Sequence, residues 1–229
     1  MMTLDRLLQL AAASGGILYL MAVLLLVALT VIIEKTIHLR LAIHRGNAVA
    51  HAVAQLHRLD DSVFKALAAR CGRDPHGAVL AVPLRYPEIR DPLRLAELLE
   101  EAVMWQVPRI DGRLWILDTI VTLAPLLGLL GTIIGMFNTF QVLGTGDSNP
   151  TQITGGVAEA LVATACGLFI AIVGLVFFNA LNNNVRLIIH QMETIKVMLV
   201  NRLDAPRQPA REPEPELGAV RAIRRSGEG

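Results

Sequence analysis

Three long apolar stretches divide the chain, and each has a length suited to crossing a lipid bilayer. They cover residues 17–33, 114–143 and 157–181, and the third contains 25 residues. A helix rises about 1.5 Å per residue, so about 20 apolar residues cross the ~30 Å hydrocarbon layer. The pattern predicts an all-α integral membrane protein with three transmembrane helices.

The segment between the first two spans is polar, with 12 Lys/Arg and 11 Asp/Glu in residues 34–118. It has a helical pattern up to about Ala69, and prolines then break any long helix between Cys71 and Pro92. We expect Cys71 in a loop, and a new helix that starts with Asp91 as its N-cap and Pro92 as its first residue. The new helix is predicted to run on into the second span, with Pro108 as a kink point.

A helical extension is predicted to follow the third span. Val185, Ile188, Met192, Ile195 and Leu199 recur at spacings of three and four residues, which forms an apolar seam that needs partner helices. In contrast, residues 205–229 lack apolar periodicity and are predicted to be disordered.

The distribution of basic residues predicts the orientation, because Lys and Arg concentrate in cytoplasmic segments. Lys35, Arg113 and Arg186 flank the spans on one side, whereas the other side has only Arg6. We expect an N-terminus outside and a C-terminus in the cytoplasm, with no cleaved signal peptide. The predicted order is an interfacial helix (1–16), a first span (17–33), a cytoplasmic helical loop (34–113), a second span (114–143), an outside loop (144–156), a third span (157–181), a cytoplasmic extension (182–204) and a tail (205–229).

Two groups of residues stand out within the spans. Gly128, Gly131 and Gly135 fall within about 60° on one side of a helix, which predicts close helix–helix packing. Glu159 is the single charged residue of the third span, and a carboxylate at such depth is expected to face protein or water.

Composition excludes several classes of function. The net charge of +1 provides no sustained basic face for a nucleic acid. Two cysteines, one of them within a span, form no disulfide framework, and no ligand cluster indicates a metal or another cofactor. We also expect no enzyme, since no nucleophile–base pair or phosphate-binding glycine loop is present.

The second span, APLLGLLGTIIGMFNTF, and the third, GGVAEALVATACGLFIAI, resemble the two motif-bearing spans of the ExbB/TolQ family of proton-channel subunits, which is related to MotA. The resemblance implies a ring of identical subunits, a pentamer in ExbB, around single-span partners such as ExbD or TolR. It also implies a complex in the bacterial inner membrane that uses the proton motive force to energise a TonB-like protein. The alternatives are a TolQ-like subunit that serves envelope integrity and a scaffold that conducts no protons.

By matching motif positions, the resemblance implies that Thr132, Glu159 and Thr164 line the proton pathway. Other interpretations stay open: both threonines can bond carbonyls of their own helix, and Glu159 can be a helix-start carboxylate at the outer interface. Glu159 and Thr164 also lie about 140° apart on a straight helix. Both reach one lumen only if the lumen is wide, the helix is distorted, or one of them faces a neighbouring subunit.

The chain departs from the family pattern at Val173, where the family commonly has proline after Ala-Ile. Valine restores a backbone donor and removes the ring that promotes a kink. We therefore expect the third helix to be straighter around Val173 than it is with the family's proline, with a bend of no more than about 20° there.

Overall fold

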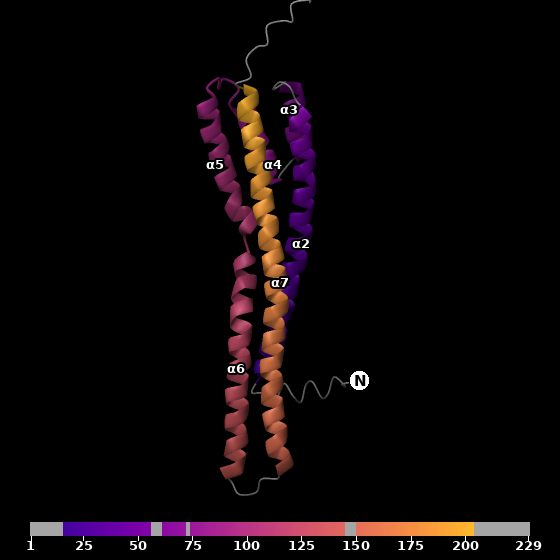
Figure 1. Cartoon of the computed structure of the whole chain (residues 1–229), viewed down its shortest axis with the longest axis vertical. Coiled ribbons are helices and arrows are strands. Elements are labelled where there is room, and N and C mark those ends of the chain that lie inside the picture. Colours follow the sequence, from indigo (N-terminus) through magenta and orange to yellow (C-terminus); the bar gives the residue numbers. More distant parts are fainter. Residues whose placement is uncertain (1–15, 56–60, 72–73, 145–149, 204–229) are drawn as a thin grey trace, which may run out of the picture.

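A computed structural model describes residues 16–55, 61–71, 74–144 and 150–203 (Figure 1). In this part of the chain all regular elements are helices: α2 (Ile17–Gln55), α3 (Asp61–Cys71), α4 (Pro75–Arg85), α5 (Pro92–Asp111), α6 (Leu114–Gly144) and α7 (Pro150–Leu203). Helices α2, α6 and α7 are each long and apolar enough to cross a membrane. The prediction of an all-α membrane protein with three spans is confirmed.

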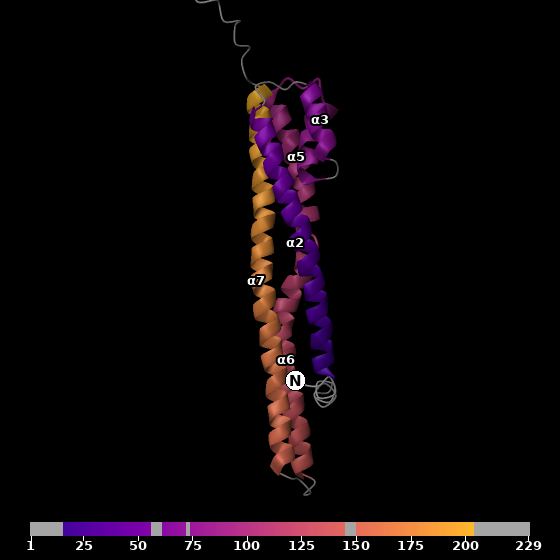
Figure 2. The ribbon, with the colours of Figure 1, turned by 90° about the vertical axis from the view of Figure 1, so that its right-hand side faces the viewer.

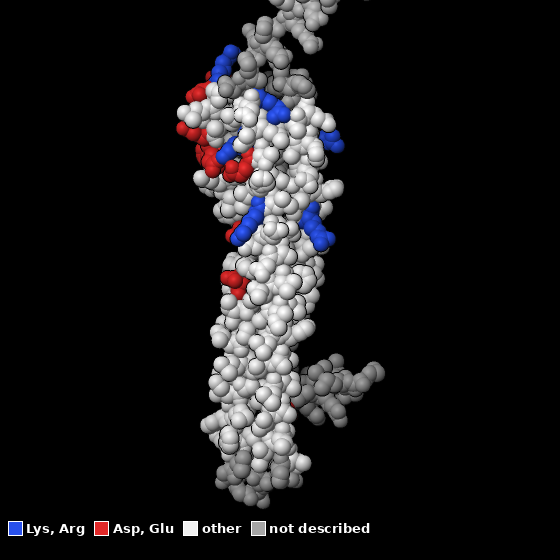
Figure 3. All heavy atoms as spheres, in the orientation of Figure 1, with Lys and Arg blue, Asp and Glu red and all other residues white. Residues whose placement is uncertain are grey.

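The helices form an elongated bundle with two different halves. The lower half in Figures 1 and 2 contains α6, most of the apolar part of α7 and the start of α2, whereas α3, α4 and α5 surround α7 and α2 in the upper half. On the face seen in Figure 3, acidic and basic residues gather over the upper half, and the described residues of the lower half are almost all white. Large apolar side chains such as Leu26, Phe140 and Phe169 are more than 60 % exposed there, which suits contact with lipid or with other apolar helices.

The upper half is held together by the seam on α7. Val185, Ile188, Met192, Ile195 and Leu199 are all buried, and α7 packs against α2, α4 and α5 along this length. An ion pair between Lys196 of α7 and Glu100 of α5 supports the contact. The prediction that this seam needs partner helices is confirmed.

Helix α5 begins as predicted but does not continue into the second span. The side chain of Asp91 accepts a 3.0 Å hydrogen bond from the backbone N–H of Leu93, so Asp91 is the N-cap and Pro92 the first helical residue. At the other end, Gly112 and Arg113 separate α5 from α6, and Arg113 has a φ of 72°. The expectation of an unbroken helix is wrong, because the left-handed backbone of Arg113 ends the helical path. Pro108 lies inside α5, and a kink there stays a prediction.

Two further boundaries differ from the predictions. Cys71 is the last residue of α3 and is buried, so it does not lie in a loop. Residues 150–156 belong to α7 instead of the predicted connection. A proline is favourable at the first position of a helix, and Gly156 lies directly against Thr139 of α6, which allows the two helices to pair up to this end. The predicted interfacial helix, the centre of the outside loop and the tail lie outside the described residues.

Candidate functional site

The glycine side of α6 faces α7 at close range. A Cβ atom added to Gly131 would lie 2.8 Å from the Cβ of Ala163, and one added to Gly135 would lie 2.9 Å from the Cβ of Ala160. These distances are shorter than a carbon–carbon contact allows, so residues larger than glycine would push the helices apart. Gly128 occupies the same side, next to the Cα atom of Thr164.

Thr164 connects the two helices by a hydrogen bond. Its hydroxyl donates to the backbone carbonyl of Gly128 over 2.9 Å, across 36 positions of sequence. In a regular α-helix this same carbonyl accepts the backbone N–H of Thr132, four residues later. The side chain of Thr164 is half-buried and lies beside the glycine contact.

Thr132 behaves differently from Thr164. Its hydroxyl donates to the carbonyl of Leu129 in its own helix over 2.7 Å, and its side chain is half-buried. Thr132 therefore has the local bond that membrane threonines commonly form, whereas Thr164 does not. Gly131 lies close to Ile17 of α2. Thr132 is about 100° from Gly131 around the helix, so the two residues do not share one face of α6.

Glu159 is half-buried next to Ala160, which packs on Gly135. Its carboxylate has no hydrogen-bond or ion-pair partner among the described residues. On a helix, Ala160 and Ala163 lie between Glu159 and Thr164, which are about 140° apart. Because these two alanines contact α6, Glu159 and Thr164 occupy opposite edges of the α6–α7 contact and do not meet within one chain.

A second polar cluster lies in the upper half, and sequence reasoning missed it. His76 of α4 is fully buried, and its Nε2 atom lies 3.1 Å from Oε1 of Gln191 of α7. The amide nitrogen of Gln191 donates to the side chain of Asn47 over 2.8 Å and to the carbonyl of Ile43. The contact is close because Gly46 has no side chain, and a glycine inside a polar helix was the available signal.

The two ring nitrogens of His76 have different environments. Its Nδ1 atom is buried and has no hydrogen-bond partner in the described part of the chain. Burial lowers the pKa of His76 below its ordinary value of 6.5, and the contact with Gln191 opposes this shift in part. The imidazole is therefore neutral at physiological pH, and it joins α4 to α7 and α2 as a structural group.

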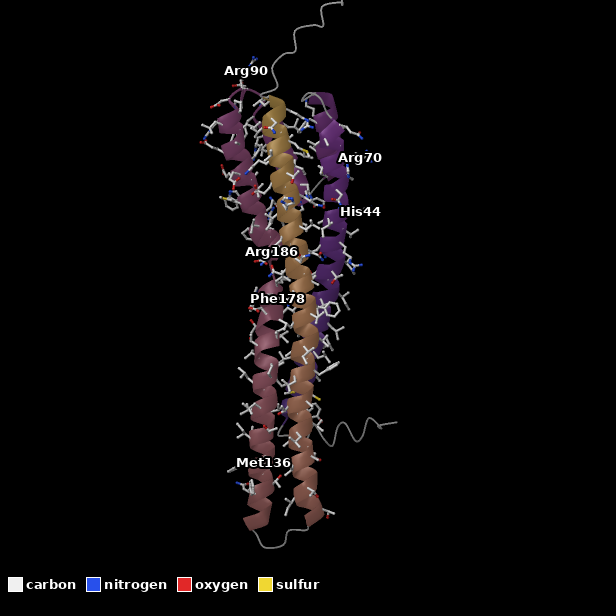
Figure 4. The ribbon with its side chains drawn as sticks, viewed as in Figure 1. His44, Arg70, Arg90, Met136, Phe178 and Arg186 are labelled. Carbon is white, nitrogen blue, oxygen red and sulfur yellow. The ribbon has the colours of Figure 1, made fainter. Side chains whose placement is uncertain are left out.

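The described residues contain no group of three or more His, Cys, Asp or Glu side chains that could hold a metal ion. Figure 4 illustrates the distribution of charge, with Arg70, Arg90, His44 and Arg186 in the upper part of the bundle and Met136 low on α6.

Comparison with known proteins finds relatives that are similar to part of the chain. The chain is 42% identical over 84 residues to an ExbB-like biopolymer transport protein of Synechocystis, a stretch that covers 35% of this chain and 40% of the relative. It is 42% identical over 78 residues to the biopolymer transport protein ExbB of Aquifex aeolicus, covering 34% and 53% of the two chains. It is also 34% identical over 84 residues to the Tol-Pal system protein TolQ of Haemophilus influenzae, covering 36% and 37%.

These similarities span about half of each relative's length or less. A family model gives the broader match: that of the MotA/TolQ/ExbB proton channel family matches residues 72–194, which is more than half of the 229 residues. This range includes α4, α5, α6 and most of α7, and with them Thr132, Glu159 and Thr164. The chain therefore belongs to the MotA/TolQ/ExbB proton channel family.

Proposed function

We propose that this protein is a proton-channel subunit of a bacterial inner-membrane complex that uses the proton motive force to energise a TonB-like protein. The observation that carries the proposal is the presence of Glu159 and Thr164 at the two edges of the α6–α7 contact, within the half whose exposed surface is mainly apolar. Intramembrane carboxylates are costly in free energy and mark ion pathways. Family membership and the ExbB-named relatives support the same function.

In this proposal Thr132, Glu159 and Thr164 line the proton pathway. Hydroxyl groups both donate and accept hydrogen bonds, so threonines beside a carboxylate can hold a chain of water. Thr164 already uses its proton on the carbonyl of Gly128, which leaves its oxygen lone pairs available as acceptors. The oxygen lone pairs of Thr132 are also available as acceptors, because its hydroxyl proton is donated within its own helix.

We also propose that the pathway is completed by other copies of the chain. Since Glu159 and Thr164 lie on opposite edges of the α6–α7 contact, one chain cannot present both to a narrow lumen. In a closed ring of identical subunits, each pair of neighbours brings the edge with Glu159 toward the edge with Thr164 of the next copy. We propose a homo-pentamer that surrounds single-span ExbD/TolR-like partners, with its N-terminus in the periplasm and its C-terminus in the cytoplasm.

A TolQ-like subunit for envelope integrity is the second candidate, and the TolQ relative favours it. The chemistry of the pathway is the same in both candidates, and only the client protein differs. Complementation separates them: strains that lack ExbB or TolQ are transformed with this gene together with its own partner gene. Growth that depends on outer-membrane import indicates the TonB client, and resistance to detergent indicates the Tol client.

The channel itself is tested by proton flux into liposomes that contain the protein with and without its ExbD/TolR-like partner. We expect Glu159→Ala and Thr164→Val to reduce flux through the complex. Thr30→Val is a matched control, because Thr30 lies in the apolar part of α2 and bonds its own helix at the carbonyl of Leu26 over 2.8 Å. Unchanged flux in both test variants would remove these residues from the pathway, and absence of flux in the unchanged complex would favour a scaffold.

A further inference from the structure

A cavity of about 960 Å³ opens beside the α5–α6 junction, away from the three residues of the proposed pathway. It is bordered by α2, by the first two turns of α4 and by the end of α5, while Ile188 of α7 forms part of its wall. Leu39 and Ala42 of α2 contribute further apolar surface. The cavity is large enough for a phosphate group together with the small organic group attached to it.

The lining contains three cationic side chains and two carboxylates. Lys35, Arg109 and Arg113 border the cavity, and the carboxylates that border it, Glu34 and Asp74, are already paired with arginines. Glu34 forms an ion pair with Arg113. Asp74 forms one with Arg45, which lies outside the lining, at 2.9 Å.

The two remaining cations are held in different ways. Lys35 is 9 % exposed, and its Nζ atom donates to the carbonyl of Ile110 over 3.0 Å, which leaves two of its three donors for another acceptor. Arg109 is exposed and has no ion-pair or hydrogen-bond partner among the described residues. Together they provide a buried point charge and a free guanidinium at one cavity, which favours an anionic ligand.

The cavity lies at the level where the apolar half of the bundle ends. Trp115 is 69 % exposed two residues after Arg113, and tryptophan is enriched at the level of lipid headgroups. On α2, Ile33 and Ile37 are exposed on either side of Glu34 and Lys35. A phosphate bound here is therefore at the depth of a lipid headgroup, and the attached acyl chains can lie on exposed apolar surface.

We propose that this cavity binds the phosphate headgroup of an anionic phospholipid, from the leaflet on the side of α3, α4 and α5. Basic pockets between transmembrane helices bind such headgroups. Arg109 offers paired N–H donors to the phosphate oxygens, and Lys35 adds a charge at the base of the cavity. The proposal goes beyond proton conduction and depends neither on the ring nor on the client protein.

The test uses the full-length protein in phosphatidylcholine vesicles that contain a minor share of phosphatidylglycerol. The protein is extracted in mild detergent, and the lipid that remains bound is identified by mass spectrometry. We expect phosphatidylglycerol to be enriched over its share in the vesicle, and Arg109→Gln to reduce this enrichment about five-fold. Arg90→Gln, which removes an exposed arginine at the far end of the bundle (Figure 4), leaves the enrichment unchanged.

A second measurement separates a lipid from a soluble phosphate compound. Inorganic phosphate is titrated into the detergent-solubilised protein, and thermal stability is recorded for the unchanged chain and for Arg109→Gln. Two results would overturn the proposal. One is that the two lipids stay bound in the same proportion as in the vesicle, and the other is that a folded Arg109→Gln variant has unchanged enrichment. Stabilisation by inorganic phosphate without enrichment of phosphatidylglycerol would overturn the assignment to a lipid and point to a soluble phosphate ligand.

Discussion

The hydroxyl of Thr164 on α7 donates a 2.9 Å hydrogen bond to the backbone carbonyl of Gly128 on α6. This contact exists because Gly128 has no side chain, so the two helix backbones come close enough for a threonine to reach across. A residue at a motif position thus has a structural role as well as a proposed place in the pathway. Variants at Thr164 must separate the two roles.

We predict that Thr164→Val lowers the free energy of unfolding by about 1 kcal/mol, because valine keeps the shape and loses the interhelical bond. Thr164→Ser retains the hydroxyl and is expected to retain most of the stability. Thermal unfolding in detergent, followed by circular dichroism, measures both variants. Equal losses in Thr164→Val and Thr164→Ser would contradict a role for the hydrogen bond.

Gly131→Ala is predicted to destabilise the α6–α7 pair by about 1–3 kcal/mol, since the added methyl group overlaps Ala163. The double variant Gly131→Ala, Ala163→Gly restores space and should recover part of the loss. Gly155→Ala is the matched control, because a Cβ atom there meets nothing within 4 Å. If Gly131→Ala and Gly155→Ala have the same unfolding temperature, the close contact does not govern stability.

Stability is predicted to fall in mild acid because of His76. Its pKa is lowered in the folded chain, so the unfolded chain binds the proton more readily. The contribution of His76 is therefore complete above the unfolded pKa of 6.5 and is lost as the pH falls below this value toward the lower pKa of the folded state. The slope approaches about 1.4 kcal/mol per pH unit in this window.

The measurement is the unfolding temperature as a function of pH between neutral and mildly acidic buffer. His76→Phe is expected to be less stable at neutral pH, because the side-chain oxygen of Gln191 loses its partner, but also less sensitive to acid. His44→Gln changes an exposed histidine on α2 and serves as the control. A His76→Phe chain that loses stability in acid as steeply as the unchanged chain would assign the effect to other groups.

The left-handed backbone of Arg113 gives a prediction that is independent of its ion pair. Arg113→Gly and Arg113→Ala both remove the contact with Glu34, but glycine adopts a φ of 72° without strain and alanine does not. We expect Arg113→Gly to be more stable than Arg113→Ala by about 1 kcal/mol. The opposite order in denaturant unfolding would mean that the junction changes conformation in the variants.

The straightness of α7 around Val173 also stays a prediction. The helix is continuous from Pro150 to Leu203, and valine allows regular hydrogen bonding through position 173. An experimental structure should have a bend below about 20° there, while Val173→Pro should increase the bend and destabilise the helix by about 3 kcal/mol. A larger bend centred on Val173 in the unchanged chain would refute this expectation.

Much of the fold follows from the order of residues alone. Long apolar runs have few alternatives to transmembrane helices, so the three spans were predictable, and the seam from Val185 to Leu199 was predictable from its period. The N-cap at Asp91 was predictable because a capping side chain and the following proline act locally. Within the spans, the glycine spacing on α6 predicted a closely packed side, but it did not predict which helix packs against that side.

The tertiary structure decided what depends on distant residues. The break at Arg113 is accompanied by contacts from Glu34 and Lys35, which lie far away in sequence. His76 meets Gln191 across 115 positions, and Gly46 alone could not indicate which residues of α4 and α7 meet beside it. The bond from Thr164 to Gly128 depends on which faces of α6 and α7 pack together, and this is set by the summed contacts of two whole helices rather than by either motif.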